Sequence, residues 1–209
     1  QLNMVEIQLE EASKRFQYEW IFRNLSLTIA EGQSVAITGS NGSGKSTLLK
    51  CLSGAVPISS GSIRFQNNGK SIPESEWFNY LTISAPYLEL PEEFTLRELI
   101  DFHFKFKSPL NGISKAEILE TIFLEEHAEK MISQFSSGMK QRLKLGLALL
   151  SEVPIVLLDE PTSNLDRKGI LWYQELIEKF ALNRLLIVCS NEPREYEFCQ
   201  QKVVLEDYK

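Results

Sequence analysis

The feature that most constrains this chain is a glycine-rich segment, Gly39–Thr47, with the sequence GSNGSGKST. The apolar run 34–38 before it is typical of a short buried strand. The segment after it, up to about residue 53, places Leu48, Leu49 and Leu52 on one side of a helix. A strand, a tight turn and a helix in this order are the local structure that such a glycine pattern requires.

The segment fits the pattern G-x-x-x-x-G-K-[ST] of the phosphate-binding loop of P-loop NTPases, and residues 39–47 are called the phosphate loop below. Its glycines let successive N–H groups point into one concavity, and the following helix N-terminus adds partial positive charge. Lys45 is expected to reach the β- and γ-phosphates, and the Ser46 hydroxyl to ligate Mg²⁺. The alternative, a glycine-rich turn with a chance Lys-Ser pair, is disfavoured by the flanking strand and helix. The candidate nucleotide-binding residues are Gly39, Ser40, Asn41, Gly42, Ser43, Gly44, Lys45, Ser46 and Thr47.

Composition limits the class of protein. The chain has 209 residues and a formal net charge of −6, which fits one domain with a sizeable core and argues against broad electrostatic binding to nucleic acid. No apolar run approaches the roughly 18–20 residues that span a bilayer, and no secretory signal is visible. Residues 1–3, before Met4, are interpreted as a remnant or a trimmed end.

The cysteines and histidines do not form a metal-binding pattern. Cys51, Cys189 and Cys199 have no C-x-x-C spacing, and the only histidines are His103 and His127, so no structural zinc site is expected. We expect Cys51 and Cys189 to be inert core residues, and a reducing cytoplasm fits this cysteine usage.

Strand and helix patterns alternate along the chain. We expect strands at residues 5–9, 24–29, 34–38, 61–65, 80–85, 155–160, 185–190 and 202–206. Besides the helix after the phosphate loop, we expect helices from Thr95, from Ser114 to about Leu124, from about Ser136 and from about Asp166. Apolar strands that alternate with helices predict an α/β fold, with a mostly parallel sheet and helices on both faces.

Capping boxes mark two of these helix starts, at Thr95 and Ser114. The aromatic stretch that follows Thr95 alternates like a strand. We nevertheless favour a helix, with Leu99, Phe102 and Phe106 on one face.

The apolar run 155–160 ends in two acids, Asp159 and Glu160. A strand here would deliver both carboxylates to the carboxyl end of the sheet, where α/β folds bind ligands. Asp159 is then expected to hold Mg²⁺ through its water shell, and Glu160 to polarise the water that attacks the γ-phosphate. An ordinary strand end with an acidic turn is the alternative.

Taken together, these residues resemble the nucleotide-binding subunit of ATP-binding cassette (ABC) transporters over nearly the whole chain. Residues 39–46 are similar to the family's Walker A loop, and 155–160 to its Walker B strand. Phe135–Arg142, called the signature segment below, resembles the L-S-G-G-Q signature with its basic extension. Ser163–Asp166 resembles the D-loop. Phe16 lies where the family places the aromatic residue that stacks on adenine, with Tyr18 as a rival and core packing as the alternative.

The resemblance implies a fold and cofactors. The expected fold is an α/β P-loop NTPase core with a mostly parallel sheet, an N-terminal antiparallel β subdomain and a helical insert subdomain. Residues 1–209 would form one domain, with the ATP-binding core at 1–88 and 151–209 and the helical subdomain at 89–150. The implied cofactors are ATP and Mg²⁺, with Ser46 and Asp159 on the metal.

The resemblance also implies a dimer of cassettes that closes over two nucleotides. The residues that would act in trans across this dimer are Ser136, Ser137, Gly138 and Asp166. A serine at a helix N-terminus can offer a hydroxyl, backbone N–H groups and a positive dipole end to a phosphate. The alternative for this serine and its neighbours is a plain helix cap.

Three departures from the family pattern concern catalysis. In the signature, Ser137 replaces a glycine and Met139 a glutamine, and both changes are mild. Pro86 lies about where the family has a glutamine that contacts Mg²⁺, and Asn191 replaces the switch histidine. Losing one charge-assisted contact in a transition state costs about 2–4 kcal/mol. We therefore expect a slow ATPase with the catalytic residues Lys45, Glu160 and Asn191.

The leading interpretation is the ATPase subunit of an ABC transporter, bound to a separate transmembrane permease at the inner face of the cytoplasmic membrane. The candidate permease contacts are the loop Tyr87–Phe94 and any exposed members of Phe102, Phe104 and Phe106, of which at least two are expected in the core of the helical insert. The partner cassette is a second copy or a related subunit, and no nucleic-acid partner is expected. The alternatives are a soluble assembly ATPase and a regulatory cassette that binds ATP without turnover.

Overall fold

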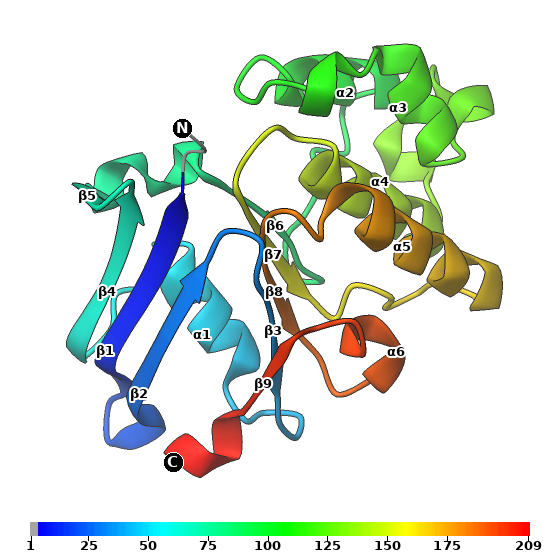
Figure 1. The fold of residues 1–209 in the computed structure, drawn as a ribbon. Helices are drawn as coiled ribbons and strands as arrows, with labels where there is room; N and C mark the ends of the chain where they lie inside the picture. The colour runs from blue at the N-terminus through cyan, green and yellow to red at the C-terminus, as the bar shows by residue number, and fades with distance from the viewer. Residues whose placement is uncertain (1–3) are drawn as a thin grey trace.

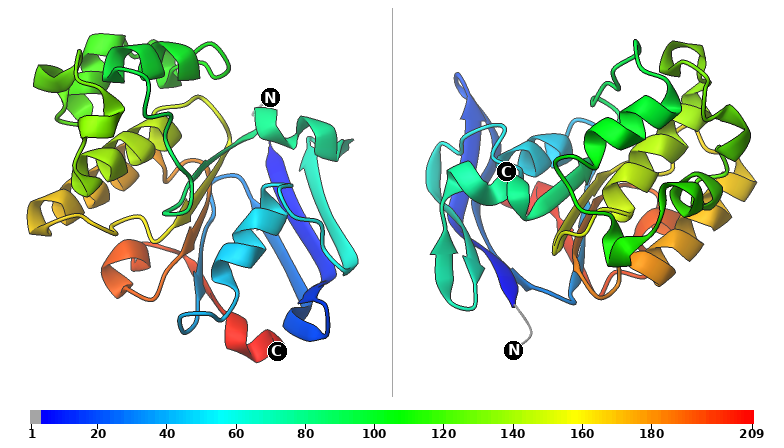
Figure 2. Two further views of the ribbon diagram at one scale, coloured as in Figure 1. Left: turned by 180° about the vertical axis from the view of Figure 1, so that it is seen from behind. Right: turned by 90° about the horizontal axis from the view of Figure 1, so that it is seen from above.

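The structure is a computed structural model that describes residues 4–209, so the interpretation of residues 1–3 lies outside the described part. It confirms the α/β fold. In Figure 1 an antiparallel sheet, the helix α1 (Lys45–Leu52), a parallel sheet and a layer of helices follow one another from left to right. The two further views in Figure 2 show the same succession, with α1 between the two sheets.

The antiparallel sheet has the strand order β2-β1-β4-β5. Its strands are β1 (Val5–Phe16), β2 (Glu19–Ala30), β4 (Ser60–Asn67) and β5 (Lys70–Ile72). The first two strands are longer than predicted, because the pairing of β1 with β2 continues to Phe16 through register shifts near Ala12 and Lys14. Positive φ angles of 47° at Glu11 and 52° at Asn24 mark these irregularities, which interrupt the alternation that a sequence pattern can detect.

The second sheet is parallel throughout, in the order β6-β7-β8-β3-β9. Its strands are β3 (Ser34–Thr38), β6 (Leu81–Ser84), β7 (Ile155–Asp159), β8 (Leu185–Cys189) and β9 (Gln201–Val204). The last strand ends at Val204, two residues before the predicted end, and the chain continues as the 3₁₀ helix η5 (Leu205–Tyr208). All five strands therefore end at one edge, where the loops after β3, β7 and β8 meet.

Alternate side chains of the parallel sheet belong to two hydrophobic cores. Val156, Leu158, Leu186 and Val188 face the helices α4 and α5. Their neighbours Ile155, Leu157, Leu185 and Ile187 pack with α1 and the antiparallel sheet. Since both faces are covered, the strands are continuous apolar runs, as the sequence pattern suggested.

The helices between the strands are α2 (Leu96–His103), α3 (Lys115–Thr121), α4 (Ser137–Leu149), α5 (Arg167–Phe180) and α6 (Pro193–Tyr196). Short 3₁₀ helices lie between them at η1 (Glu74–Asn79), η2 (Leu110–Gly112), η3 (Glu125–His127) and η4 (Ile132–Gln134). Both predicted capping boxes are present, at Thr95 and Ser114.

Two helix predictions require correction. α3 ends at Thr121, ahead of the predicted end near Leu124, and Phe123 has a φ of 55°. α2 ends at His103, so Phe106 lies beyond it.

The aromatic residues of this part also differ from the expectation. Phe102 is 43% exposed and Phe106 71% exposed, and the two rings form an edge contact at the surface with a centroid separation of 5.2 Å. Of the three phenylalanines, Phe104 alone packs against the core.

The cysteine prediction agrees with the structure. Cys51 and Cys189 are buried, and burial raises the pKa of both thiols, which keeps them protonated and inert. Within residues 4–209, no helix is both long enough and apolar enough to cross a bilayer.

Candidate active site

The phosphate loop connects the end of β3 to α1, as predicted. Gly44 is the N-cap residue of α1 and has a φ of 107°, which L-residues rarely adopt. A Cβ atom at this position would lie 2.3 Å from Cγ2 of Ile21, so β2 approaches the loop too closely for any side chain here. The glycine pattern is therefore required by backbone conformation and by packing.

Lys45 is 6% exposed and lies folded over its own loop. Its Nζ donates to the carbonyl oxygens of Gly39 at 2.5 Å and Ser40 at 3.1 Å. An ammonium group has three donors, so one remains for an incoming phosphate oxygen. Two of the three donors therefore hold the Lys45 charge at the loop.

Asn191 follows β8 and contacts the same loop. Its Oδ1 accepts a hydrogen bond from the Gly39 N–H at 3.1 Å, and its Nδ2 donates to Oδ1 of Asn41 at 3.2 Å. The residue predicted in place of the switch histidine therefore lies at the phosphate loop, bonded to two of its residues.

The two acids at the end of β7 have different environments. Asp159 is 1% exposed, and neither carboxylate oxygen has a hydrogen-bond partner. Burial raises its pKa, while the nearby Ser46 hydroxyl and Lys45 favour the ionised form. Glu160 is exposed and has a φ of 43°, and its N–H donates to the Cys189 carbonyl at 2.9 Å. This strained backbone turns Glu160 away from the strand toward the site.

Two neighbouring cavities lie over these residues. The smaller, about 230 Å³, is lined by Ile21, Asn41, Gly42, Gly44, Lys45, Ser46, Thr47 and Glu160. The larger, about 560 Å³, extends toward the D-loop and the segment after β8 and includes Asn191. Asn41 and Glu160 line both cavities, so the predicted base faces the space above the phosphate loop.

The aromatic candidate for adenine stacking lies at the end of the β1–β2 hairpin. Phe16 is 49% exposed and its ring contacts Nζ of Lys14 at 4.7 Å from the centroid, while Tyr18 is 96% exposed. Neither ring lines the two cavities described above. Ile21 of β2 lines the smaller cavity and was not predicted, because it lies outside the strand expected at residues 24–29.

The signature segment begins α4. Ser136 is the N-cap residue, and its Oγ accepts a hydrogen bond from the Met139 N–H at 3.2 Å. A Cβ at Gly138 would lie 3.2 Å from the Asn164 carbonyl oxygen, so the helix start packs closely on the D-loop. Asp166 caps α5 by accepting from the Gly169 N–H at 2.8 Å. Ser136 and Ser137 are exposed. Neither serine is among the described residues that line the two cavities.

A buried carboxylate that the sequence reasoning missed connects two functional segments. Glu195 of α6 is 3% exposed, and its Oε1 accepts from the N–H of Thr162 at 2.7 Å and from the Thr162 hydroxyl. Its Oε2 accepts from the hydroxyl of Ser190, the residue before Asn191. The segment before the D-loop and the segment carrying Asn191 are therefore joined through one side chain.

The residues present fit a magnesium ion. Asp159 offers two buried oxygens without partners, beside the Ser46 hydroxyl, and hard oxygen donors of this kind are the ligands Mg²⁺ prefers. No group of three or more His, Cys, Asp or Glu within residues 4–209 could hold a metal alone. Such an ion would therefore need further oxygens from nucleotide and water, which is how Mg²⁺ binds in phosphoryl-transfer sites.

Comparison with known proteins identifies the family. The profile of the family described as ABC transporter matches residues 22–163. The chain is 31% identical over 189 residues to the lantibiotic transport ATP-binding protein SrtF of Streptococcus pyogenes, covering 88% of this chain and 79% of that protein. It is 38% identical over 170 residues to the spermidine/putrescine import ATP-binding protein PotA of Thermotoga maritima, covering 78% of this chain and 45% of that protein.

Solved structures show the same fold. A bacterial Atm1-family ABC exporter with ATP bound has a TM-score of 0.81 at 22% identity, over 98% of this chain and 38% of that one. The dimeric structure of MJ0796, a bacterial ABC transporter cassette, has a TM-score of 0.77 at 24% identity, over 95% of this chain and 94% of that one. The chain belongs to the ABC transporter family of ATP-binding proteins. It is an ATPase of the transporter cassette class, and the assembly and regulatory alternatives are not favoured.

Proposed function

We propose that this chain binds Mg-ATP on its phosphate loop and hydrolyses it between two cassettes, driving a separate transmembrane permease at the cytoplasmic face of the membrane. One observation carries the proposal. Three adjacent strands, β3, β8 and β7, end beside the phosphate loop, so that Lys45 of this loop lies together with Asp159, Glu160 and Asn191. The residues at 1–88 and 151–209 would bind nucleotide, and 89–150 would carry the signature segment and the permease contact.

The residues around the smaller cavity are assigned different roles in this proposal. The phosphate loop N–H groups and Lys45 hold the phosphates, and Ser46 and Asp159 would hold Mg²⁺. The metal, when bound, supplies positive charge to the β- and γ-phosphate oxygens. Thr47 lines the same cavity one position further along α1.

The hydrolytic step is assigned to Glu160 and Asn191. Glu160 would accept a hydrogen bond from the attacking water and align it with the γ-phosphate. Asn191 would turn its amide toward the same phosphate once nucleotide displaces its contacts with Gly39 and Asn41. An amide carries no charge, so it stabilises the transition state less than a protonated histidine, and turnover is expected to be slow.

The signature segment is proposed to act on the nucleotide of a second cassette. Ser136 and Ser137 are exposed at the N-terminus of the 13-residue helix α4, where the helix dipole favours an anion. Gly138 is at the start of α4 and packs on the D-loop, and Asp166 of the D-loop caps the start of α5. The signature segment and the D-loop would therefore present one surface to the partner cassette. The partner is a second copy of this chain or a related cassette.

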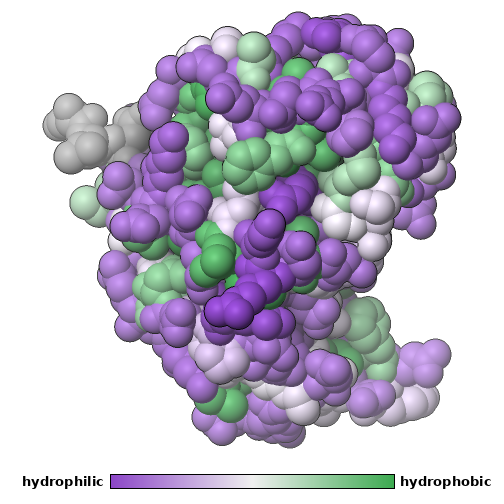
Figure 3. All heavy atoms as spheres, turned by 90° about the vertical axis from the view of Figure 1, so that its right-hand side faces the viewer, coloured by the Kyte–Doolittle hydropathy of each residue, from purple (hydrophilic) through white to green (hydrophobic). Residues whose placement is uncertain are grey.

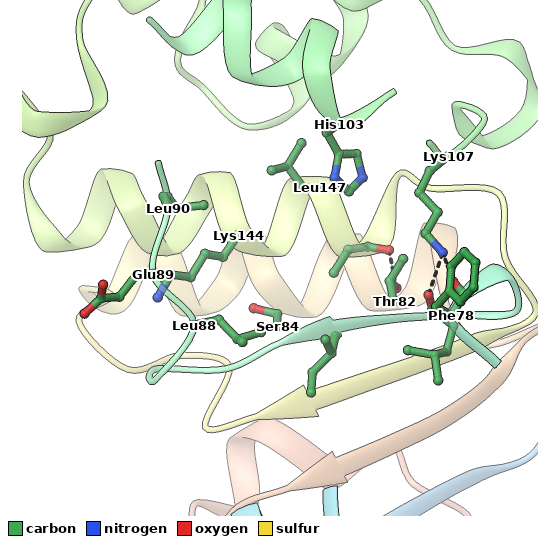
Figure 4. A pocket seen from close by; sticks show the side chains of 13 residues that line it. Phe78, Thr82, Ser84, Leu88, Glu89, Leu90, His103, Lys107, Lys144 and Leu147 are labelled. Carbon is green, nitrogen blue, oxygen red and sulfur yellow. Dashed lines mark hydrogen bonds between the residues drawn. The ribbon is translucent and has the colours of Figure 1, made fainter. Parts of the chain in front are cut away.

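A groove beside the helical part is proposed to bind the permease. It has a volume of about 400 Å³ between β6, the residues that follow this strand, α2 and α4. Leu88, Leu90 and Leu147 line it together with Lys107 and Lys144 (Figure 4). The groove includes part of the predicted loop Tyr87–Phe94, but the three candidate phenylalanines are not among its lining residues.

The chemistry of the groove specifies the partner segment. Burial lowers the pKa of both lysines, whose Nζ atoms donate to carbonyl oxygens at its edge, including Leu81 at 3.0 Å and Ala85 at 3.3 Å. A short apolar helix with an acidic side chain would satisfy both the apolar walls and the cations. The side of the molecule in Figure 3 is largely hydrophilic with separate apolar patches, which favours contact through a local groove.

Co-purification tests this proposal. The tagged chain, expressed at its natural level, is recovered in detergent from the membrane fraction and from the soluble fraction. We expect a multi-spanning protein at about equal stoichiometry in the membrane fraction, and its loss from a Leu147→Asp variant. Recovery with soluble partners only would overturn the permease assignment.

A further inference from the structure

The register of the parallel sheet brings two distant segments together. β3 and β9 pair in parallel with Thr38 opposite Val204, so the phosphate loop and η5 start side by side. The pairing ends there, and the next residues of the two segments contact each other through side chains. No residue of η5 lines the two cavities described above.

Glu206 of η5 accepts a hydrogen bond on Oε1 from the Ser40 N–H, across 166 positions of sequence. This bond and the Ser40 hydroxyl, with the nearby Lys45 ammonium, lower the pKa of Glu206, so the carboxylate is ionised at neutral pH. Charge-assisted hydrogen bonds to backbone N–H groups are roughly twice as strong as neutral ones.

The other carboxylate oxygen also contacts the loop. A Cβ on Gly39 would lie 2.4 Å from Oε2 of Glu206 and 2.7 Å from Oγ of Ser43. Both of these oxygens are buried without a hydrogen-bond partner. The Glu206 carboxylate therefore packs against the backbone of Gly39, the first residue of the phosphate loop after β3.

Two further contacts attach the same segment to the loop. Nζ of Lys209 donates to the Ser43 carbonyl oxygen at 2.9 Å. Leu205 is fully buried, and its Cδ2 would lie 3.6 Å from a Cβ on Gly44. A carboxylate, an ammonium group and an apolar side chain of this C-terminal segment therefore contact the phosphate loop at Ser40, Ser43 and Gly44 in turn.

We propose that Glu206 is a positioning residue, which together with Lys209 holds the outer side of the phosphate loop so that its remaining N–H groups point inward before nucleotide arrives. A glycine-rich loop has many accessible conformations, and fixing it in advance lowers the entropic cost of binding. The role rests on the proposed nucleotide-binding function. Because the residues of η5 line neither cavity of the candidate active site, the contacts are expected to act on ATP affinity and not on the chemical step.

The charge of Glu206 allows a rival outcome. A carboxylate near the loop could repel the phosphates of ATP, in which case its removal would tighten binding. The two roles predict changes of opposite sign in the dissociation constant of ATP, so one titration separates them.

The test compares Glu206→Ala, Glu206→Gln and Lys209→Met with wild type in the assembled complex. The matched control is Asp207→Ala, which removes an exposed carboxylate from the same turn. ATP itself is titrated by calorimetry, kcat is measured at saturating Mg-ATP, and thermal melting confirms folding. The Gln variant keeps an oxygen that can accept from the Ser40 N–H, so it is the conservative rescue.

We expect the dissociation constant of ATP to rise about 10-fold in Glu206→Ala and about 3-fold in Glu206→Gln and Lys209→Met, with kcat and the control within about 2-fold of wild type. A dissociation constant unchanged or lowered in the folded variants would overturn the positioning role. If Glu206→Ala does not fold, the other two variants decide the question by the same criterion. A wild-type protein that binds no ATP would overturn the proposed function as well.

Discussion

Asn191 is proposed to act in turnover, and its two hydrogen bonds place it at the phosphate loop. We expect Asn191→Ala to lower kcat about 10-fold with a small change in ATP affinity, because a neutral donor is lost from the transition state. Asn191→His should raise kcat by restoring a side chain that can be charged. Single-turnover hydrolysis of Mg-ATP measures both, and equal rates in the three proteins would remove Asn191 from the catalytic set.

His103 allows a test of how the stability of the protein depends on pH. Burial, with a contribution from Lys107, lowers its pKa from 6.5 to about 4, and its Nε2 lies 2.8 Å from Oγ of Ser151. Below pH 6.5 the unfolded chain binds a proton that the folded protein excludes. The free energy of unfolding should therefore fall by about 2–3 kcal/mol between pH 6.5 and pH 4.

Urea unfolding at pH 7.5, 5.5 and 4.5 measures this change. His103→Gln keeps a polar partner for Ser151 but cannot titrate, so its stability should depend less on pH over this range. Identical pH profiles for the variant and wild type would show that another group controls acid stability.

Among the elements, α6 matters more than its four residues suggest, because Glu195 joins the segments before the D-loop and before Asn191. Glu195→Ala leaves the Thr162 N–H and two hydroxyls without their acceptor. We expect the free energy of unfolding to fall by about 2–4 kcal/mol and kcat to fall with it. Glu197→Ala, an exposed change next to the same helix, should alter stability by less than about 0.5 kcal/mol. Chemical denaturation of both variants compares them directly.

The elements also show which predictions a sequence allows. Local signals were sufficient for the phosphate loop, for the apolar strands and for the capping boxes at Thr95 and Ser114, because each depends on residues within a few positions. The end of α2 at His103 was missed, because Phe102 and Phe106 fit one face of a helix, yet the chain turns after His103 and the two rings pair at the surface.

Contacts at long range could not be predicted at all. The bonds of Glu206 to Ser40 and of Glu195 to Thr162 depend on strand order and register, which no local pattern determines. The same is true of Ile21, which lines the site because β2 lies against the phosphate loop at Gly44.

For the whole molecule, the exposed signature serines predict that two chains close over nucleotide. We expect Glu160→Gln with Mg-ATP to form a species of about twice the 23.9 kDa chain mass, because ATP binds but is not hydrolysed. Adding Ser136→Ala should weaken this dimer. Light scattering coupled to size exclusion measures the mass, and a monomer at saturating ATP would contradict action in trans between copies of this chain.

The hydrolysis of Mg-ATP by the assembled complex, compared between wild type and Glu160→Gln, tests the central claim most directly. Glu178→Gln, an exposed change on α5, is the matched control. We predict slow but measurable phosphate release in wild type and in the control, and a loss of about 100-fold or more in Glu160→Gln with ATP binding retained. Equal rates in wild type and Glu160→Gln would contradict the assignment of this site as the one that hydrolyses ATP.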